Sequence, residues 1–154
     1  MGKAWIAPNA TVVGDVTMQE DVSIWYGAVL RGDSGAITVG RGTNIQDNCV
    51  LHEKTTIGDG CTVGHGAIVH GCTIGNRCMV GMGAMVLTGA VIGDDCLIGA
   101  GALVTGKMNA PAGSVLLGSP AKIVKQITPE QMEEIRLDGD NYIRLAQAPA
   151  MKEV

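Results

Sequence analysis

A period of six residues runs through most of the chain. Large aliphatic residues recur at every sixth position from Val12 to Val104, and a small residue lies two places before most of them. Alternate residues of a β-strand face the same side of a sheet, so both members of each pair point inward. Three extra residues interrupt the period between Arg31 and Gly35, and one residue is missing from it after residue 70. The sequence therefore predicts sixteen short strands, which make a little over five coils.

No other common architecture has this spacing. An amphipathic helix repeats apolar residues at spacings of three and four, and antiparallel hairpins bring turn signals every eight to twelve residues. We therefore predict an all-β solenoid of parallel coils. Glycines that follow the large residue, such as Gly58, Gly75 and Gly93, are expected at corners that need tolerant backbone angles. The five cysteines, which show no CxxC spacing, are expected to be small buried residues.

A helix is predicted after the coil. Thr128 and Pro129 have the pattern of an N-cap followed by a proline in the first turn. The predicted organisation is a solenoid over residues 1–127, a helix packed on the coil over 128–147, and a tail over 148–154.

Charge and hydropathy narrow the partners. The net charge is −4 and there is no basic run, which argues against a nucleic-acid or anionic-membrane surface and favours a small solute. The N-terminal residues lack the apolar core of a signal peptide, and no apolar run approaches the roughly twenty residues of a membrane span. We therefore predict no membrane association and a cytoplasmic location.

All three histidines lie within nineteen positions. His52 and His70 are eighteen residues apart, so they are expected to stack on successive coils roughly 4.8 Å apart. Arg31 lies in the same column, on the coil before His52. His65 stacks over Asp47 on the preceding edge, and the five extended residues from His65 to His70 span roughly 16 Å. A histidine at an exposed corner is most often only solvated, but three in matching columns favour a metal site. Because one metal cannot bridge that gap, we predict sites shared between subunits of a homotrimer.

The repeat resembles the hexapeptide-repeat family over residues 4 to 124, ending in the segment PAGSVLLGSPAKIV. Members of that family form left-handed parallel β-helices, and the predicted handedness rests on this resemblance alone. The histidine region is similar to the γ-class carbonic anhydrase-like branch, through AVLRGD at 28–33, NIQDNCVLH at 44–52 and VGHGAIVHG at 63–71.

This resemblance implies roles for eight residues. It implies His52, His65 and His70 as metal ligands, with zinc as the metal, although iron(II) and cobalt also accept imidazole. The implied residues beside the metal are Gln46, which would hold the metal-bound oxygen, Arg31 with Asp33 and Asp47 as an ion-pair group joining subunits, and Tyr142 in the pocket. The ion-pair group could equally be only a structural contact of the trimer, and Tyr142 only a packing residue.

The predicted activity is the reversible hydration of carbon dioxide to bicarbonate by a metal-dependent lyase. The chain departs from the active pattern, because Ser34 stands where a glutamate follows the RxD motif and no acidic loop is inserted near His52. Glu53 is a candidate proton shuttle or an ordinary solvent-facing carboxylate. The alternatives are a hexapeptide-repeat acyltransferase, an acyl-coenzyme A thioesterase, and a non-catalytic trimer stabilised by metal.

Overall fold

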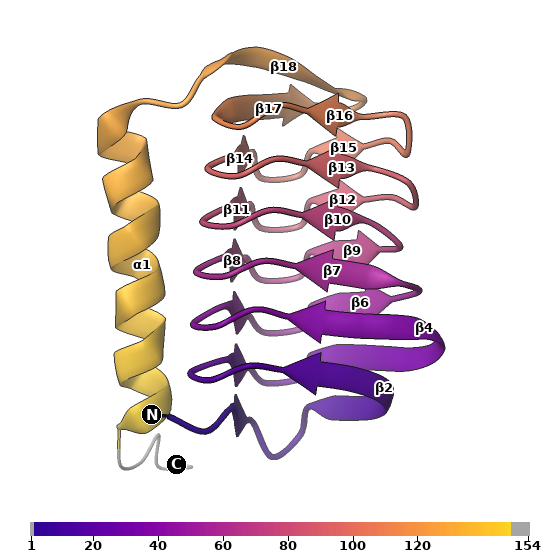
Figure 1. The fold of residues 1–154 in the computed structure, drawn as a ribbon, viewed down its shortest axis with the longest axis vertical. Coiled ribbons are helices and arrows are strands. Elements are labelled where there is room, and N and C mark those ends of the chain that lie inside the picture. Colours follow the sequence, from indigo (N-terminus) through magenta and orange to yellow (C-terminus); the bar gives the residue numbers. More distant parts are fainter. Residues whose placement is uncertain (1, 149–154) are drawn as a thin grey trace.

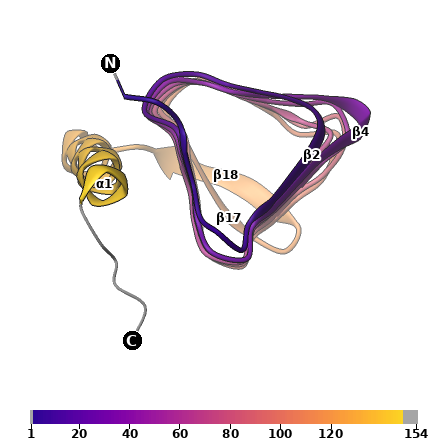
Figure 2. The ribbon, with the colours of Figure 1, turned by 90° about the horizontal axis from the view of Figure 1, so that it is seen from below.

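The computed structural model describes residues 2–148 and shows a parallel β-solenoid of about six turns, with one helix, α1 (Pro129–Gln147), beside it (Figure 1). The cross-section is triangular (Figure 2). Seen from the N-terminal end, the chain winds counterclockwise as it recedes from the viewer (Figure 2), so the coil is left-handed. The predicted fold class is confirmed.

Each side of the triangle is a column of short parallel strands. Face one consists of β1 (Trp5–Ile6), β3 (Ser23–Ile24), β5 (Asn44–Ile45), β8 (Thr62–Val63), β11 (Met79–Val80), β14 (Leu97–Ile98) and β17 (Ser114–Gly118). Face two contains β6 (Val50–His52), β9 (Ile68–His70), β12 (Met85–Val86) and β15 (Leu103–Val104), and face three contains β7 (Thr55–Ile57), β10 (Thr73–Ile74), β13 (Val91–Ile92) and β16 (Asn109–Ala110). The long strands β2 (Thr11–Met18) and β4 (Val29–Val39) turn the corner from face two to face three. The strand β18 (Ala121–Gln126) pairs antiparallel with β17 and closes the top.

The coil is longer than the periodicity predicted. The strand β1 precedes the first counted unit, and β16 and β17 follow the last one. Ala110 of β16 lies in register with Ile92 but is too small to be recognised as the large member of a pair. The core itself is as predicted, since the inward aliphatic residues are almost completely buried.

The cysteines also lie where the pattern placed them. All five are buried and none forms a disulfide. Burial raises the pKa of Cys49 to about 11 and that of Cys72 to about 12, so both thiols are protonated at neutral pH. They act as small apolar residues that fill the narrow interior.

The corner glycines are required for a reason other than the predicted one. Gly58, Gly75 and Gly93 do not have a positive φ. A Cβ on Gly58 would lie 2.7 Å from the carbonyl carbon of Gly75, and a Cβ on Gly75 would lie 2.8 Å from that of Gly93. The coils therefore approach each other too closely at this corner for a side chain. The left-handed backbone occurs two residues later, at Gly60 with φ 64° and at Arg77 with φ 54°.

Two glycine substitutions should change stability in opposite directions. Gly75→Ala is expected to lower the free energy of unfolding by about 1–3 kcal/mol, because the added methyl group overpacks a rigid backbone contact. Gly139→Ala should raise it by about 0.5–1 kcal/mol, since Gly139 lies in the interior of α1 and its added Cβ would meet only the carbonyl oxygen of Gly60, at 3.9 Å. Urea unfolding followed by circular dichroism, at one protein concentration, measures both. A stabilised Gly75→Ala variant would contradict the stacking explanation.

The helix α1 begins at the predicted cap and lies along face one. Thr128 Oγ1 accepts a hydrogen bond from the backbone N–H of Gln131, and the Gln131 side chain accepts one from the N–H of Thr128. The helix contacts β3, β5 and β8. Residues 149–154 of the predicted tail lie outside the described part of the chain.

The four aromatic residues of the chain hold α1 against the first coils. The rings of Trp25 and Tyr142 are 5.1 Å apart and nearly perpendicular, and those of Trp5 and Trp25 are 4.7 Å apart. Tyr26 completes the cluster at 6.0 Å from Trp5. Edge-to-face aromatic pairs each contribute about 0.5–1.5 kcal/mol beyond the area that they bury. This cluster determines where Tyr142 lies on the coil.

The slip of three residues forms a projection at one corner. Leu30 of β4 pairs with Leu51, twenty-one residues away, whereas pairs on the following coils, such as Leu51 with Val69, are eighteen apart. The extra residues of β4 extend outward where face two meets face three (Figure 2). The projection carries Asp33 and Ser34 to the side chain of His52.

Candidate metal centre

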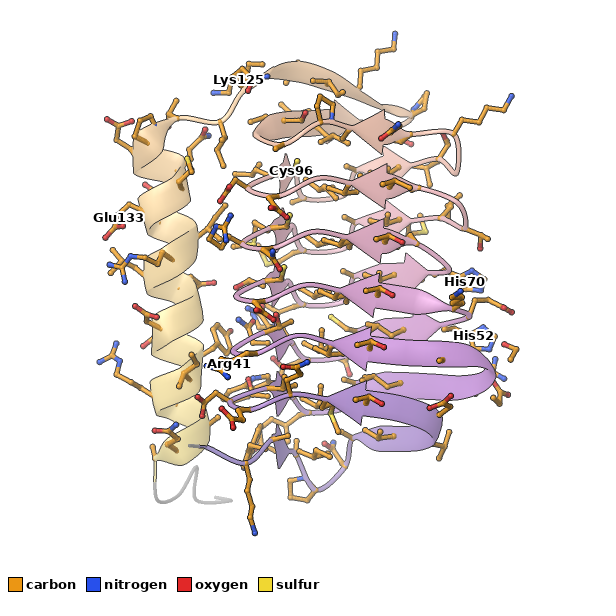
Figure 3. The ribbon with its side chains drawn as sticks, in the orientation of Figure 1. Arg41, His52, His70, Cys96, Lys125 and Glu133 are labelled. Atoms are coloured by element: carbon orange, nitrogen blue, oxygen red, sulfur yellow. The ribbon has the colours of Figure 1, made fainter. Side chains whose placement is uncertain are left out.

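Two histidines lie together where face two meets face three, a corner that we call the His52 edge. Arg31 of β4, His52 of β6 and His70 of β9 are in register on three successive coils. The two imidazoles point outward, on the side of the coil away from α1 (Figure 3). His52 Nδ1 is 3.3 Å from His70 Nε2.

This separation fits a metal site. Two nitrogen ligands that each lie about 2.0–2.1 Å from a tetrahedral zinc are about 3.3 Å apart. A carboxylate adds to the set, because ligand atoms of His52, Glu53 and His70 all lie within 4.8 Å of one another. The residues present on this edge therefore suit a divalent metal.

The outer nitrogen of each imidazole already has a partner. Asp33 Oδ1 is 3.0 Å from His52 Nε2, and Ser34 Oγ is 3.1 Å from the same nitrogen. Thr88 Oγ1 is 2.8 Å from His70 Nδ1. Such partners fix the tautomer and the orientation of ligating histidines, and here they leave His52 Nδ1 and His70 Nε2 facing each other. The repeat gives no direct signal for Thr88, because pairs between these two coils are seventeen residues apart and Thr88 lies eighteen after His70.

The predicted ion-pair group is divided between two places in one chain. Arg31 donates to Asp33 Oδ2 at 2.6 Å. Desolvation raises the pKa of Asp33, but the hydrogen bonds from Arg31 and His52 outweigh it and hold that pKa below its usual range. Asp47 is elsewhere, with its Oδ2 2.8 Å from His65 Nδ1.

His65 and Asp47 lie where face one meets face two, a corner that we call the His65 edge. His65 is half exposed and lines a pocket of about 290 Å³. The polar residues of this pocket are Gln46, Thr62, His65, Asp138 and Tyr142, and its apolar residues include Met79, Met82 and Ala100. Gln46 is buried, and its amide donates to Asn44 Oδ1 at 3.1 Å, which fixes its direction. Three predicted site residues therefore share one pocket: Gln46, His65 and Tyr142.

Asp138 is a pocket residue that the sequence reading missed. It lies one helical turn before Tyr142, so both reach the pocket from the same side of α1. Burial raises the pKa of Asp138, against the opposing effects of His65 and Thr62. Burial also raises the pKa of Tyr142, helped by the negative charges of Asp138 and Asp47. The i, i+4 spacing of an acid and a tyrosine on a predicted helix is the signal that could have identified it.

Face two separates the two edges, and His65 is not part of the three-ligand cluster found within residues 2–148. The outward residues of this face form an apolar column in register. They are Val29, Val50, Ile68, Met85 and Leu103. The outward residues of face three are mostly threonines instead, namely Thr17, Thr38, Thr56 and Thr73.

Comparison with known proteins decides the family. The family model described as "Bacterial transferase hexapeptide (six repeats)" matches residues 36–71 and 71–106. The protein named "Probable carbonic anhydrase" from Methanocaldococcus jannaschii is 44% identical over 146 residues, which cover 92% of each chain. This chain belongs to the γ-class carbonic anhydrase-like family of hexapeptide-repeat proteins.

Two further similar proteins carry different names, one a carbonic anhydrase and one a hexapeptide transferase. "Gamma carbonic anhydrase 2, mitochondrial" from Arabidopsis thaliana is 45% identical over 95% of this chain, which spans only 56% of that relative's length. A solved structure of a hexapeptide transferase family protein from Anaplasma phagocytophilum is 44% identical, with a TM-score of 0.91 over 94% of this chain and 87% of that one. Within the described residues, no helix has the length and apolar character needed to cross a membrane.

Proposed function

We propose that this chain catalyses the metal-dependent reversible hydration of carbon dioxide, at sites shared between subunits of a homotrimer. The observation that carries the proposal is the division of the histidines. His52 and His70 present two nitrogens 3.3 Å apart on one edge, while His65 lies in a pocket on the other edge. Three imidazoles with an open fourth position are the ligand set of catalytic zinc, and the division requires a second subunit to complete it.

The apolar column of face two supports the trimer. It lies between the two edges, and Met85 on it is 39% exposed. Three copies packed around a threefold axis, each with face two turned toward that axis, would bury the column. This packing would bring the His65 edge of one subunit to the His52 edge of the next. The contact is heterologous and closes after three copies, which gives three identical sites.

Each residue of the proposed site has a distinct task. A metal held there would lower the pKa of a bound water to about 7, as zinc does in carbonic anhydrases. Asp33 and Thr88 hold the imidazoles of His52 and His70 in the orientation that ligation needs. Gln46, fixed by Asn44, orients the attacking oxygen, and Arg31 with Asp33 would join the Asp47 side of the partner across the interface.

Proton removal should limit turnover. Ser34 offers a hydroxyl to His52 at the position where the active pattern has a glutamate, and the neighbouring carboxylate of Asp33 is held by Arg31. Hydration releases one proton in every cycle, so buffer must carry it away. We expect measurable but modest hydration activity that rises with buffer concentration, with zinc or with iron(II) under anaerobic conditions. Stopped-flow assays of fully metallated protein, with the metal-free protein as control, measure it. Absence of turnover above that control with both metals would refute the proposal.

One observation favours a second activity. The pocket continues from His65 along Met79, Met82 and Ala100, which is more apolar room than carbon dioxide needs. An acyl-coenzyme A thioesterase could use the same metal there, and hydrolysis of acyl-coenzyme A by the same samples would support it. An acyltransferase would need one histidine as a base and no metal, so the paired imidazoles argue against it. Full metal occupancy without any turnover would identify a non-catalytic trimer. The cytoplasmic location of the protein stays a prediction.

A further inference from the structure

A single chain already carries three ligands for one metal. The ligand atoms of His52, Glu53 and His70 lie within 4.8 Å of one another, and Glu53 Oε1 is 4.0 Å from His52 Nδ1. The Glu53 side chain is 38% exposed, so it can rotate the remaining distance toward the two imidazoles. Its role in the chain is otherwise unexplained, because it forms no closer ion pair within the described residues.

The backbone at Glu53 has the left-handed conformation of a corner residue. Glu53 adopts a left-handed conformation with φ 60°. Gly71, which follows His70 as Glu53 follows His52, has nearly the same conformation with φ 63°. Glycine adopts this backbone without strain, whereas a residue with a Cβ does so at a cost in energy. The coil of His52 thus carries a carboxylate at the corner position where the coil of His70 carries a glycine.

The directions of the imidazoles suit the same ligand set. Asp33 occupies His52 Nε2 and Thr88 occupies His70 Nδ1, so the nitrogens left free are His52 Nδ1 and His70 Nε2. Two imidazoles and one carboxylate bind zinc in hydrolytic enzymes and iron(II) in non-haem oxygenases. The carboxylate also offsets part of the charge of a divalent cation.

We propose that one chain captures a divalent metal through His52, Glu53 and His70 before assembly, and that His65 of the partner subunit then displaces Glu53. The inference rests on the shared metal site proposed above and adds the order in which that site is built. Glu53 is a ligand of the single chain and leaves the metal when the trimer forms. The metal is therefore present before the interface forms.

The test uses a chain that cannot assemble. Met85→Glu and Leu103→Glu together place charge on the apolar column of face two and change no proposed ligand, and sedimentation checks that the product is a monomer. In competition with a chelating dye, this monomer is expected to bind one zinc per chain. Adding Glu53→Gln should weaken that binding at least about tenfold, the scale of losses at metal sites. Adding Glu134→Gln, the same change on the exposed surface of α1, should leave it unaltered.

A second background serves if the double variant stays associated or fails to fold. His65→Ala removes the partner's ligand from the trimer and leaves only His52, Glu53 and His70. We expect it to keep weakly bound zinc that Glu53→Gln removes, whereas Glu53→Gln alone in the wild-type trimer should lower zinc affinity less than threefold. The inference is overturned if Glu53→Gln leaves zinc affinity unchanged in the background tested, or if that background binds none. Carbon dioxide hydration by the wild type is assayed in parallel, so a failure of the activity alone leaves the binding result standing.

Discussion

Replacing His52 with alanine is expected to reduce carbon dioxide hydration to the level of the metal-free protein. The substitution removes one of the two nitrogens that lie 3.3 Å apart, so no pair of imidazoles remains on that edge. A metal then has only His70 and Glu53 of one chain and the His65 of the partner subunit, and Asp33 and Ser34 lose the group that they orient. Metal content after gel filtration and stopped-flow turnover should fall together.

A matched control separates this effect from loss of fold. Thr73→Ala changes an outward threonine of face three, on the same coil as His70 but away from both edges. This variant should keep both metal and turnover. Sedimentation and thermal unfolding of both variants show whether they remain folded. A His52→Ala protein that retains full metal content and activity would exclude His52 as a ligand.

Mixing two inactive variants should restore tight metal binding. His65→Ala removes the ligand of the His65 edge, and His70→Ala removes one ligand of the His52 edge. Neither variant alone therefore forms a complete site. After subunit exchange in equal amounts, an interface is complete where the His52 edge of a His65→Ala chain meets the His65 edge of a His70→Ala chain. With random assembly into closed rings this occurs at about one quarter of the interfaces, so about one quarter of the tightly bound zinc should return.

The control for this experiment is a second mixture. His52→Ala and His70→Ala change residues on the same edge, so no interface in their mixture carries an intact pair. Their mixture should bind no more zinc than the separate variants. If the first mixture also recovers nothing, despite labelled subunits that are seen to exchange, then all three ligands belong to one chain. Recovery in the second mixture would show that the assignment of residues to edges is wrong.

The periodicity predicted the parts of the site that depend on spacing. His52 and His70 stack because they are eighteen residues apart, and His65 stacks over Asp47 for the same reason. The contact of His70 with Thr88 crosses the place where the period shortens by one, and the contact of Asp33 with His52 crosses the inserted residues. Simple alignment by sixes cannot give the direction of side chains at such irregular corners.

The position of α1 could not be read from the coil pattern. Its beginning at Thr128 follows from local capping chemistry, but its place on face one depends on the packing of Trp25 with Tyr142. Asp138 was missed because its role depends on that packing and not on any repeat. The predicted reason for the corner glycines was wrong for Gly58, Gly75 and Gly93, since the close approach of two coils cannot be seen in one repeat.

The two irregularities of the coil lie on either side of the segment that carries the histidines. Three residues are added before Ile37, and one is missing after His70, whereas every pairing between these points keeps a spacing of eighteen. The insertion at the corner within β4 leaves this strand paired with both β6 and β7, so the solenoid accommodates it. The stacked pair of His52 and His70 would not accommodate an insertion between them, because one added residue would turn the imidazole of His70 toward the interior. Regular spacing in this segment is thus a requirement of the proposed metal centre more than of the solenoid.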